Sequence, residues 1–221
     1  MSYKAVFFDW DGTLVQTSEL IIEAHNHVRQ HFGLELIEST ESLTRGNQST
    51  RELYPQIYGD KAKEAEQVLY RFFEQNHLES LKAYEDSEIA LTRLKERNIP
   101  LGLVSNKRHS FLVKELKYLG WESFFGPVVG AGEASRDKPH PDPLLMAVDG
   151  NSLKDILYIG DTETDLKCAQ AAGCDAALIL RGRTLDHLIT AYSPTHVMEN
   201  LENIEIILEK TDPEENKKKA C

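Results

Sequence analysis

Short apolar runs alternate with amphipathic stretches along most of this 221-residue chain, and this alternation constrains the fold more than any other feature. Five runs are expected to form strands: Ala5–Phe8, Leu101–Val104, Val128–Val129, Ile156–Ile159 and Ala176–Leu180. Between them lie helical patterns at Ser87–Arg97, Ser110–Leu119 and Thr162–Ala172. Apolar strands separated by helices are typical of a parallel sheet covered on both faces. We therefore predict an α/β fold with a Rossmann-like parallel sheet, whose ligands bind at the carboxyl ends of the strands.

One long segment, from Ser18 to about Leu81, departs from the alternation and contains helical patterns only. Apolar residues recur there at helical spacing from Leu20 to Phe32, and again between Lys61 and Leu78. Such an insert after the first strand predicts an α-helical cap domain. The predicted boundaries are 1–15 and 86–210 for the α/β core, 16–85 for the cap and 211–221 for a disordered polar tail.

The charge of the chain argues against nucleic acid as a partner. Its formal net charge is −11, and its only basic run is Lys217–Lys219, whereas nucleic-acid binders usually carry a basic face. No apolar run reaches the ~20 residues of a membrane-spanning helix, and the N-terminus lacks a signal-peptide pattern. Its three cysteines have no paired spacing, so neither a disulfide framework nor a zinc ribbon is expected. We expect a cytoplasmic protein without a membrane partner.

Two aspartates, Asp9 and Asp11, follow the first predicted strand directly. Residues i and i+2 of an extended chain project to the same side, so both carboxylates would face one cavity at the end of the strand. Gly12 permits a sharp turn there. Taken alone, a turn or capping role for the aspartates is an equally good interpretation, because Asp-Gly is a common turn pair.

A second strand, Ile156–Ile159, also ends in carboxylates. Asp161 follows Gly160, and Asp165 comes one helical turn later. The alternative is a helix N-cap with acidic residues in the first turn. However, a second strand end delivering carboxylates to the same sheet edge favours a shared site. Clusters of carboxylate oxygens suit hard cations, and Mg²⁺ is the obvious candidate.

Two further segments supply groups that can hold an anion. Ser105 and Asn106 follow the strand Leu101–Val104, where a hydroxyl and turn amides suit a phosphate, although Ser105 is equally well interpreted as a helix cap. Lys138 lies in a loop that contains three prolines, which would hold its charge in place. Asp142 is predicted to be the N-cap of the next helix, with Pro143 as its first residue.

In this order, the four segments resemble the haloacid dehalogenase-like (HAD) hydrolase superfamily. The matching residues are Asp9-x-Asp11-Gly12-Thr13, Ser105, Lys138 and Gly160-Asp161-x-x-x-Asp165. The helical insert resembles the cap of the phosphoglycolate phosphatase-like branch of that superfamily. The resemblance extends to about Lys210, and the four motifs together are highly specific although each alone is weak.

The resemblance implies a role for each of these residues. Asp9 would be the nucleophile and Asp11 the acid–base, while Mg²⁺ would be bound by Asp9, by the backbone carbonyl of Asp11 and by Asp161, with Asp165 as a supporting carboxylate. Ser105 and Lys138 would hold the phosphoryl group. The substrate-binding set would also include Gly12, Thr13 and Asn106. The presence of Asp11 favours phosphate chemistry over dehalogenation.

The cap is expected to select the substrate. Its polar stretch Thr44–Arg51 contains Arg45 and Gly46, which are predicted to contact the substrate, although Arg45 is equally well interpreted as a solvated surface residue. We interpret the histidines of the first cap helix, including His25 and His27, as surface residues rather than metal ligands. Trp10, between the two aspartates, is expected to point away from them and to serve in packing.

Together these features predict a Mg²⁺-dependent phosphatase that acts on a small phosphorylated metabolite through an aspartyl-phosphate intermediate, with 2-phosphoglycolate as the leading substrate. Pyrophosphate is the main alternative, because Leu14–Ile22 resembles the pyrophosphatase branch and Gln16 departs from the aspartate common in phosphoglycolate phosphatases. A phosphosugar mutase is a third possibility. A non-catalytic phosphate-binding or regulatory module is an alternative of a different class. Either a monomer or a homodimer is expected.

Overall fold

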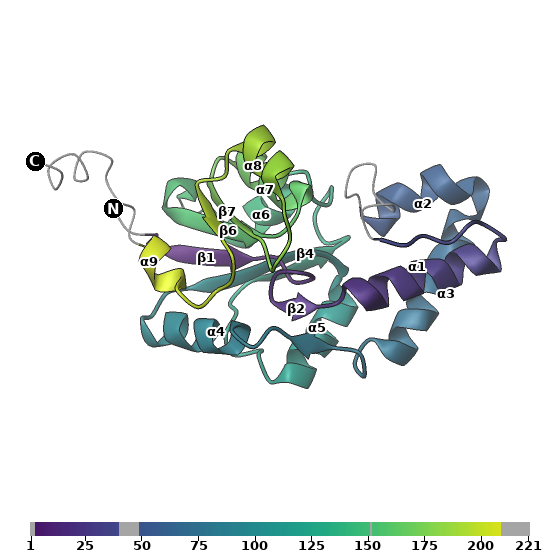
Figure 1. Cartoon of the computed structure of the whole chain (residues 1–221), viewed down its shortest axis with the longest axis horizontal. Coiled ribbons are helices and arrows are strands. Elements are labelled where there is room, and N and C mark those ends of the chain that lie inside the picture. Colours follow the sequence, from purple (N-terminus) through teal and green to yellow (C-terminus); the bar gives the residue numbers. More distant parts are fainter. Residues whose placement is uncertain (1–2, 40–48, 151, 209–221) are drawn as a thin grey trace, which may run out of the picture.

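A six-stranded parallel sheet forms the centre of the protein (Figure 1). The computed structural model describes residues 3–39, 49–150 and 152–208. The strands lie in the order β5-β4-β1-β6-β7-β8. Their bounds are Ala5–Phe8 for β1, Leu101–Arg108 for β4, Val128–Ala131 for β5, Ile156–Gly160 for β6, Asp175–Ile179 for β7 and His196–Met198 for β8. The predicted α/β fold with a parallel sheet is confirmed.

The sheet differs from the sequence prediction most at β4 and β8, while β5 extends to Ala131 and β7 begins and ends one residue earlier than expected. The strand expected to end at Val104 continues to Arg108 as β4, with a shift in register between Val104 and Arg108. The edge strand β8 was not predicted, since its three residues form no apolar run and none of them is fully buried.

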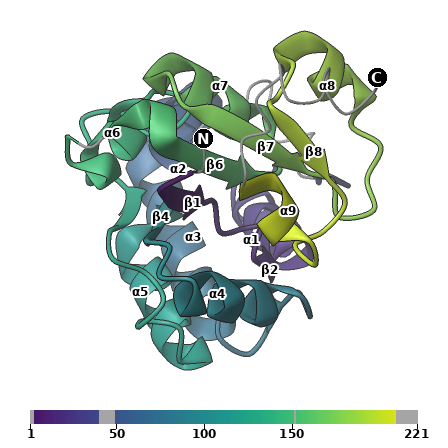
Figure 2. The same ribbon diagram turned by 90° about the vertical axis from the view of Figure 1, so that its left-hand side faces the viewer.

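Helices cover both faces of the sheet because successive side chains of each strand point to opposite sides. Val6 and Phe8 of β1 pack in one hydrophobic cluster, and Phe7 packs in another. The first cluster includes side chains of α4 (Ser87–Glu96), α5 (His109–Leu119) and α9 (Ile204–Leu208). The second includes side chains of α6 (Asp142–Val148) and α7 (Glu163–Ala172). Figure 2 shows the sheet between these groups, with α8 (Asp186–Tyr192) beside α7.

The segment between β1 and α4 forms helices beyond one end of the sheet (Figure 1). These are α1 (Ser18–His31), α2 (Thr50–Tyr58), the 3₁₀ turn η2 (Gly59–Lys61) and α3 (Ala62–Asn76). They bury a hydrophobic cluster of their own around Ala24, Tyr54 and Leu69. The predicted cap boundaries stay a prediction, and the predicted tail, 211–221, lies outside the described residues.

A two-stranded antiparallel sheet joins the chain segments that lead into and out of these helices. In it β2 (Val15–Gln16) pairs with β3 (Lys82–Ala83), so that Val15 lies opposite Ala83. Neither strand was predicted, because two residues are too few to show a periodic pattern. Among the described residues, no helix combines the length and apolar character that crossing a membrane requires.

The register of the sheet brings the predicted motifs together. Phe8, the last residue of β1, lies opposite Leu103 of β4 and Ile159 of β6. Asp9 and Asp161 therefore follow β1 and β6 at the same edge of the sheet, and Ser105 lies beside them within β4.

Candidate active site

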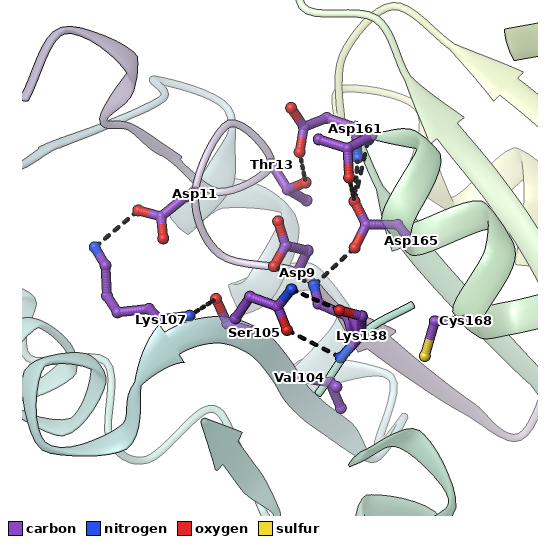
Figure 3. A network of polar contacts seen from close by, with 12 residues as sticks. Asp9, Asp11, Thr13, Val104, Ser105, Lys107, Lys138, Asp161, Asp165 and Cys168 are labelled. Atoms are coloured by element: carbon purple, nitrogen blue, oxygen red, sulfur yellow. Dashed lines mark hydrogen bonds and ion pairs between the residues drawn. The ribbon is translucent and has the colours of Figure 1, made fainter. Parts of the chain in front are cut away.

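Asp9 occupies the centre of this edge. Its backbone N–H donates to the carbonyl of Ile159 (2.8 Å), which continues the β1–β6 pairing, and its side chain is buried. The Lys138 ammonium lies 2.7 Å from Asp9 Oδ1 and 2.7 Å from Asp165 Oδ1 (Figure 3). These two carboxylates more than offset the effect of burial, so that the pKa of Lys138 is raised. Lys138 therefore places a fixed positive charge between two of the predicted site carboxylates.

Asp165 is surrounded by donors on both of its oxygens. Oδ1 also accepts the Tyr158 hydroxyl (3.1 Å), and Oδ2 accepts the backbone N–H and the hydroxyl of Thr162 in a capping box at the start of α7. Gly160 makes this approach possible, since a Cβ there would lie 2.3 Å from the Asp165 Cβ. These contacts favour a supporting role in which Asp165 orients its neighbours.

Asp161 approaches the turn that follows Asp11. Its carboxylate accepts the Thr13 hydroxyl (3.1 Å) and an Arg183 N–H (2.8 Å). Gly12 has a φ of +80°, and a Cβ at this position would lie 2.3 Å from Asp161 Oδ2. Gly12 and Thr13, predicted to bind substrate, thus shape the position of Asp161. Burial, with the nearby charge of Asp165, raises the Asp161 pKa to about 6.

Ser105 and Asn106 lie within β4 rather than beyond its end. The next helix, α5, begins at His109, so the interpretation of Ser105 as its cap is wrong. Ser105 Oγ accepts the backbone N–H of Lys107 (3.1 Å). The Asn106 side chain donates to the Lys138 carbonyl (2.9 Å) and accepts the Lys138 N–H (3.0 Å), and thereby fixes the backbone that carries the lysine.

The start of α6 also differs from the prediction by one residue. Pro141 is the N-cap, and Asp142 is the first helical residue. The carboxylate of Asp142 accepts two hydrogen bonds from Arg136 (2.9 and 3.0 Å).

Asp11 is held by two donors on one oxygen. Oδ1 accepts the Thr17 hydroxyl (2.7 Å) and lies 2.7 Å from the Lys107 ammonium. Lys107 in turn contacts Glu115 of α5 at 2.7 and 2.9 Å. Asp11 and Lys107 both line a cavity of about 520 Å³ that also exposes Asp9, Ser105, Lys138 and Asp161.

The cap helices close the other side of this cavity. Ile21, Leu69 and Phe73 line it, together with His25 and Arg51. Arg51 reaches the core loop, with its Nε 3.3 Å from Asp137 Oδ2. The predicted substrate contacts Arg45 and Gly46 lie outside the described residues.

The interpretation of the cap histidines as surface residues is wrong for His25. Its side chain is buried on α1, and Nδ1 lies 3.1 Å from the Tyr54 hydroxyl. His27 is exposed as expected. The packing role predicted for Trp10 is confirmed, since its side chain is fully buried in the core cluster.

The predicted metal residues suit a hard cation. Oxygens of Asp9, Asp161 and Asp165 lie within 4.8 Å of one another. Burial raises the pKa of Asp9, and the nearby carboxylates add to this effect while Lys138 opposes it. An all-oxygen donor set of this kind fits Mg²⁺.

Several residues of the site were not assigned from the sequence, including Lys107, Glu115 and Arg183. For Glu115 a signal exists, since it lies four residues after Phe111 and three after Leu112, on the apolar face of α5. An acidic residue on a buried helix face needs a charged partner. Arg183 follows β7 in a short polar loop, and its pairing with Asp161 depends on how that loop folds back.

Comparison with known proteins relates this chain to phosphatases. The sequence profile described as haloacid dehalogenase-like hydrolase matches residues 6–179. A pyrophosphatase PpaX of Bacillus mycoides is 28% identical, with 94% of this chain and 98% of that protein covered. A phosphoglycolate phosphatase of Photorhabdus laumondii is 25% identical, with 91% and 90% covered. A haloacid dehalogenase-like family hydrolase of Streptococcus pneumoniae has a similar fold, with a TM-score of 0.81, 20% identity and 94% and 99% coverage.

Proposed function

Because this chain belongs to the haloacid dehalogenase-like hydrolase family and is a phosphatase, we propose that it transfers the phosphoryl group of a small anionic metabolite first to Asp9 and then to water, with Mg²⁺ as cofactor. The observation that carries the proposal is the meeting of Asp9, Lys138, Ser105 and Asp161 in one cavity, although they come from distant parts of the chain. A surface turn or a helix cap would not require a buried lysine between two carboxylates.

In the first step, the Asp9 carboxylate attacks phosphorus and the bond to the leaving oxygen breaks. Ser105 and Lys138 bind the phosphoryl oxygens as their charge redistributes. The leaving oxygen takes a proton from Asp11, so that it departs as a neutral alcohol. Asp9 and Asp161, with the Asp11 carbonyl, would hold the Mg²⁺. When bound, this ion reduces the repulsion between the nucleophile and the phosphate.

In the second step, water attacks phosphorus of the aspartyl-phosphate. Asp11, now a carboxylate, accepts a proton from this water as the bond between phosphorus and the Asp9 oxygen breaks. Inorganic phosphate leaves, and Asp9 is restored. Lys138 stays between Asp9 and Asp165 throughout, which keeps the nucleophile oriented for the next cycle.

For the substrate we favour 2-phosphoglycolate, with pyrophosphate as the second candidate. Relatives that match similar shares of this chain are named for each of the two activities. Both compounds are small phosphates with a second negative group. The departure at Gln16 and the resemblance of Leu14–Ile22 to the pyrophosphatase branch support pyrophosphate. Phosphate release from both compounds, measured side by side with sugar phosphates, separates them. A mutase would isomerise a sugar phosphate with little release of free phosphate.

The mechanism is tested by Asp9→Asn, which removes the nucleophilic oxygen while keeping the size of the side chain. We expect hydrolysis of p-nitrophenyl phosphate to fall to background, because an amide is not a competent nucleophile for phosphorus. Asp149→Asn is the matched control, since Asp149 is exposed beyond the end of α6. A folded Asp9→Asn variant with normal turnover would refute the assignment.

The metal is tested with the wild type, by adding a chelator and then restoring Mg²⁺. We expect loss and recovery of phosphate release from p-nitrophenyl phosphate. If no compound in a broad panel of phosphates is hydrolysed in a metal-dependent way, a non-catalytic phosphate-binding module would be the better description.

A further inference from the structure

Lys107 connects Asp11, the proposed acid–base residue, to the buried residue Glu115. Its side chain is almost fully buried, yet it lines the same cavity as Asp11. The ammonium lies 2.7 Å from Asp11 Oδ1 and 2.7 Å from Glu115 Oε2. Burial opposes its charge, but these two carboxylates more than compensate, and the pKa of Lys107 is raised. Lys107 is therefore a charged group held between a carboxylate that faces the cavity and one that does not.

Glu115 holds the Lys107 ammonium from the interior of the protein. It is 0% exposed, and besides Lys107 it accepts the indole N–H of Trp10 at Oε2 (2.6 Å), while Oε1 lies 2.9 Å from His77 Nδ1. These partners come from the loop after β1 and from the end of α3. Because three donors surround its two oxygens, Glu115 has little freedom to move. The position of the Lys107 ammonium is fixed accordingly.

The contact with Asp11 leaves one carboxylate oxygen for chemistry. Within the described part of the chain, both recorded donors, Lys107 and the Thr17 hydroxyl, contact Oδ1. Oδ2 is thus the oxygen available to exchange a proton. A side chain that first donates a proton and then accepts one must keep the same orientation in both steps, because proton transfer requires close and aligned atoms.

We propose that Lys107 is a positioning residue, anchored by Glu115, that holds the Asp11 carboxyl group in place for both proton transfers. This inference rests on the proposed function, since it assigns Lys107 an effect only through Asp11. Two alternatives make different predictions. If Lys107 bound the phosphoryl group itself, it would matter even without Asp11. If it served only the stability of the core, it would change folding but not the balance between the two chemical steps.

The test uses Lys107→Met, which keeps the length of the side chain but removes its charge, with p-nitrophenyl phosphate as substrate. This compound has a good leaving group, so the first step needs little help from an acid, whereas the second still needs a base. We expect a rapid burst of p-nitrophenolate, followed by a steady-state rate about 10- to 100-fold below that of the wild type, which is part of the about 10²- to 10⁴-fold that acid–base catalysis contributes. Lys114→Met is the matched control, because Lys114 of α5 makes an exposed ion pair with Glu74 of α3 and does not line the cavity.

A double-mutant cycle with Asp11→Asn decides between the alternatives. In the Asp11→Asn background, Lys107→Met should change the steady-state rate by less than about 3-fold, because the residue on which it acts is already disabled. A fall of similar size in both backgrounds would overturn the proposal and indicate direct contact with the phosphoryl group. An unchanged burst and steady-state rate in Lys107→Met would overturn it as well.

Removing the lysine leaves the buried charge of Glu115 without a cation, so Lys107→Met can fail to fold. The double variant Lys107→Met/Glu115→Gln removes both charges and is measured in the same cycle. The glutamine oxygen can still accept the Trp10 indole N–H, and its NH₂ group can donate to His77 Nδ1 in the tautomer that leaves this nitrogen unprotonated. Failure of the proposed function is recognised separately. In that case the wild type itself would not hydrolyse p-nitrophenyl phosphate, whereas failure of this inference leaves the wild type and Asp9→Asn results unchanged.

Discussion

Acid should destabilise this protein through His25. The side chain is 8% exposed on α1, with the Tyr54 ring packed edge-on at 5.7 Å between centroids. Burial lowers the pKa of His25 from 6.5 to about 4, and the charge of Arg29 adds to this effect. The folded protein therefore favours the neutral imidazole, whereas the unfolded chain takes up a proton near pH 6.5.

The sign and size of the effect follow from that difference. Because the pKa is lower in the folded state, the contribution of His25 to stability is complete above pH 6.5 and is lost as the pH falls from 6.5 towards 4. One pKa unit corresponds to about 1.4 kcal/mol, so the full shift corresponds to about 3 kcal/mol of unfolding free energy. Most of this loss should be complete at pH 4.5.

The assay is urea unfolding of the wild type and of His25→Gln at pH 7.5, 6.0 and 4.5. His25→Gln should be less stable than the wild type at pH 7.5, because it loses the packing of the ring. This difference should shrink by about 2–3 kcal/mol at pH 4.5, since glutamine takes up no proton. The control, His27→Gln, removes an exposed histidine of the same helix and should follow the wild type. Parallel pH profiles for the wild type and His25→Gln would refute the reasoning.

Two further predictions concern the core site. Lys138→Met should lower the unfolding free energy in urea by about 3–5 kcal/mol and abolish phosphatase activity, because it leaves Asp9 and Asp165 as buried carboxylates without their cation. A loss below about 1 kcal/mol would contradict this. Gly12→Ala should weaken Mg²⁺ binding at least about tenfold in calorimetric titration, since its Cβ would displace the Asp161 carboxylate and the φ of +80° disfavours alanine. Unchanged affinity would mean that Asp161 does not hold the metal.

The strands were predictable where burial left a continuous apolar run. The runs at Ala5–Phe8 and Ile156–Ile159 become β1 and β6, because a parallel strand covered on both faces needs apolar residues at every position. No continuous apolar run marks β8 (His196–Met198), which lies at the edge of the sheet. The two-residue strands β2 and β3 are too short to contain one. The order of the strands in the sheet was also not predictable, since periodicity reports the environment of each segment but not its neighbours.

Of the candidate site, the sequence predicted mainly the residues that lie at the ends of strands. Asp9 and Asp161 follow apolar strands directly, and the rule that ligands bind at carboxyl ends places them together. The substrate contact of Asn106 stays a prediction, and nothing in the sequence indicated that its side chain also holds the backbone of Lys138. His25 was assigned to the surface because helical spacing shows which residues share a face, but not which polar side chain the next helix will cover.

The parallel sheet, the helical insert and the kind of chemistry could all be predicted, because buried strands and the carboxylates that follow them are local features of the chain. The pairing of the buried charges, in contrast, is set by how the elements pack. The position of Glu115 on the apolar face of α5 indicates that it is buried, but its partners Lys107, Trp10 and His77 are set only when α5 packs against the loop after β1 and the end of α3. Such pairings join residues far apart in the sequence, and their energies depend on distance and burial, which exist only after the chain has folded.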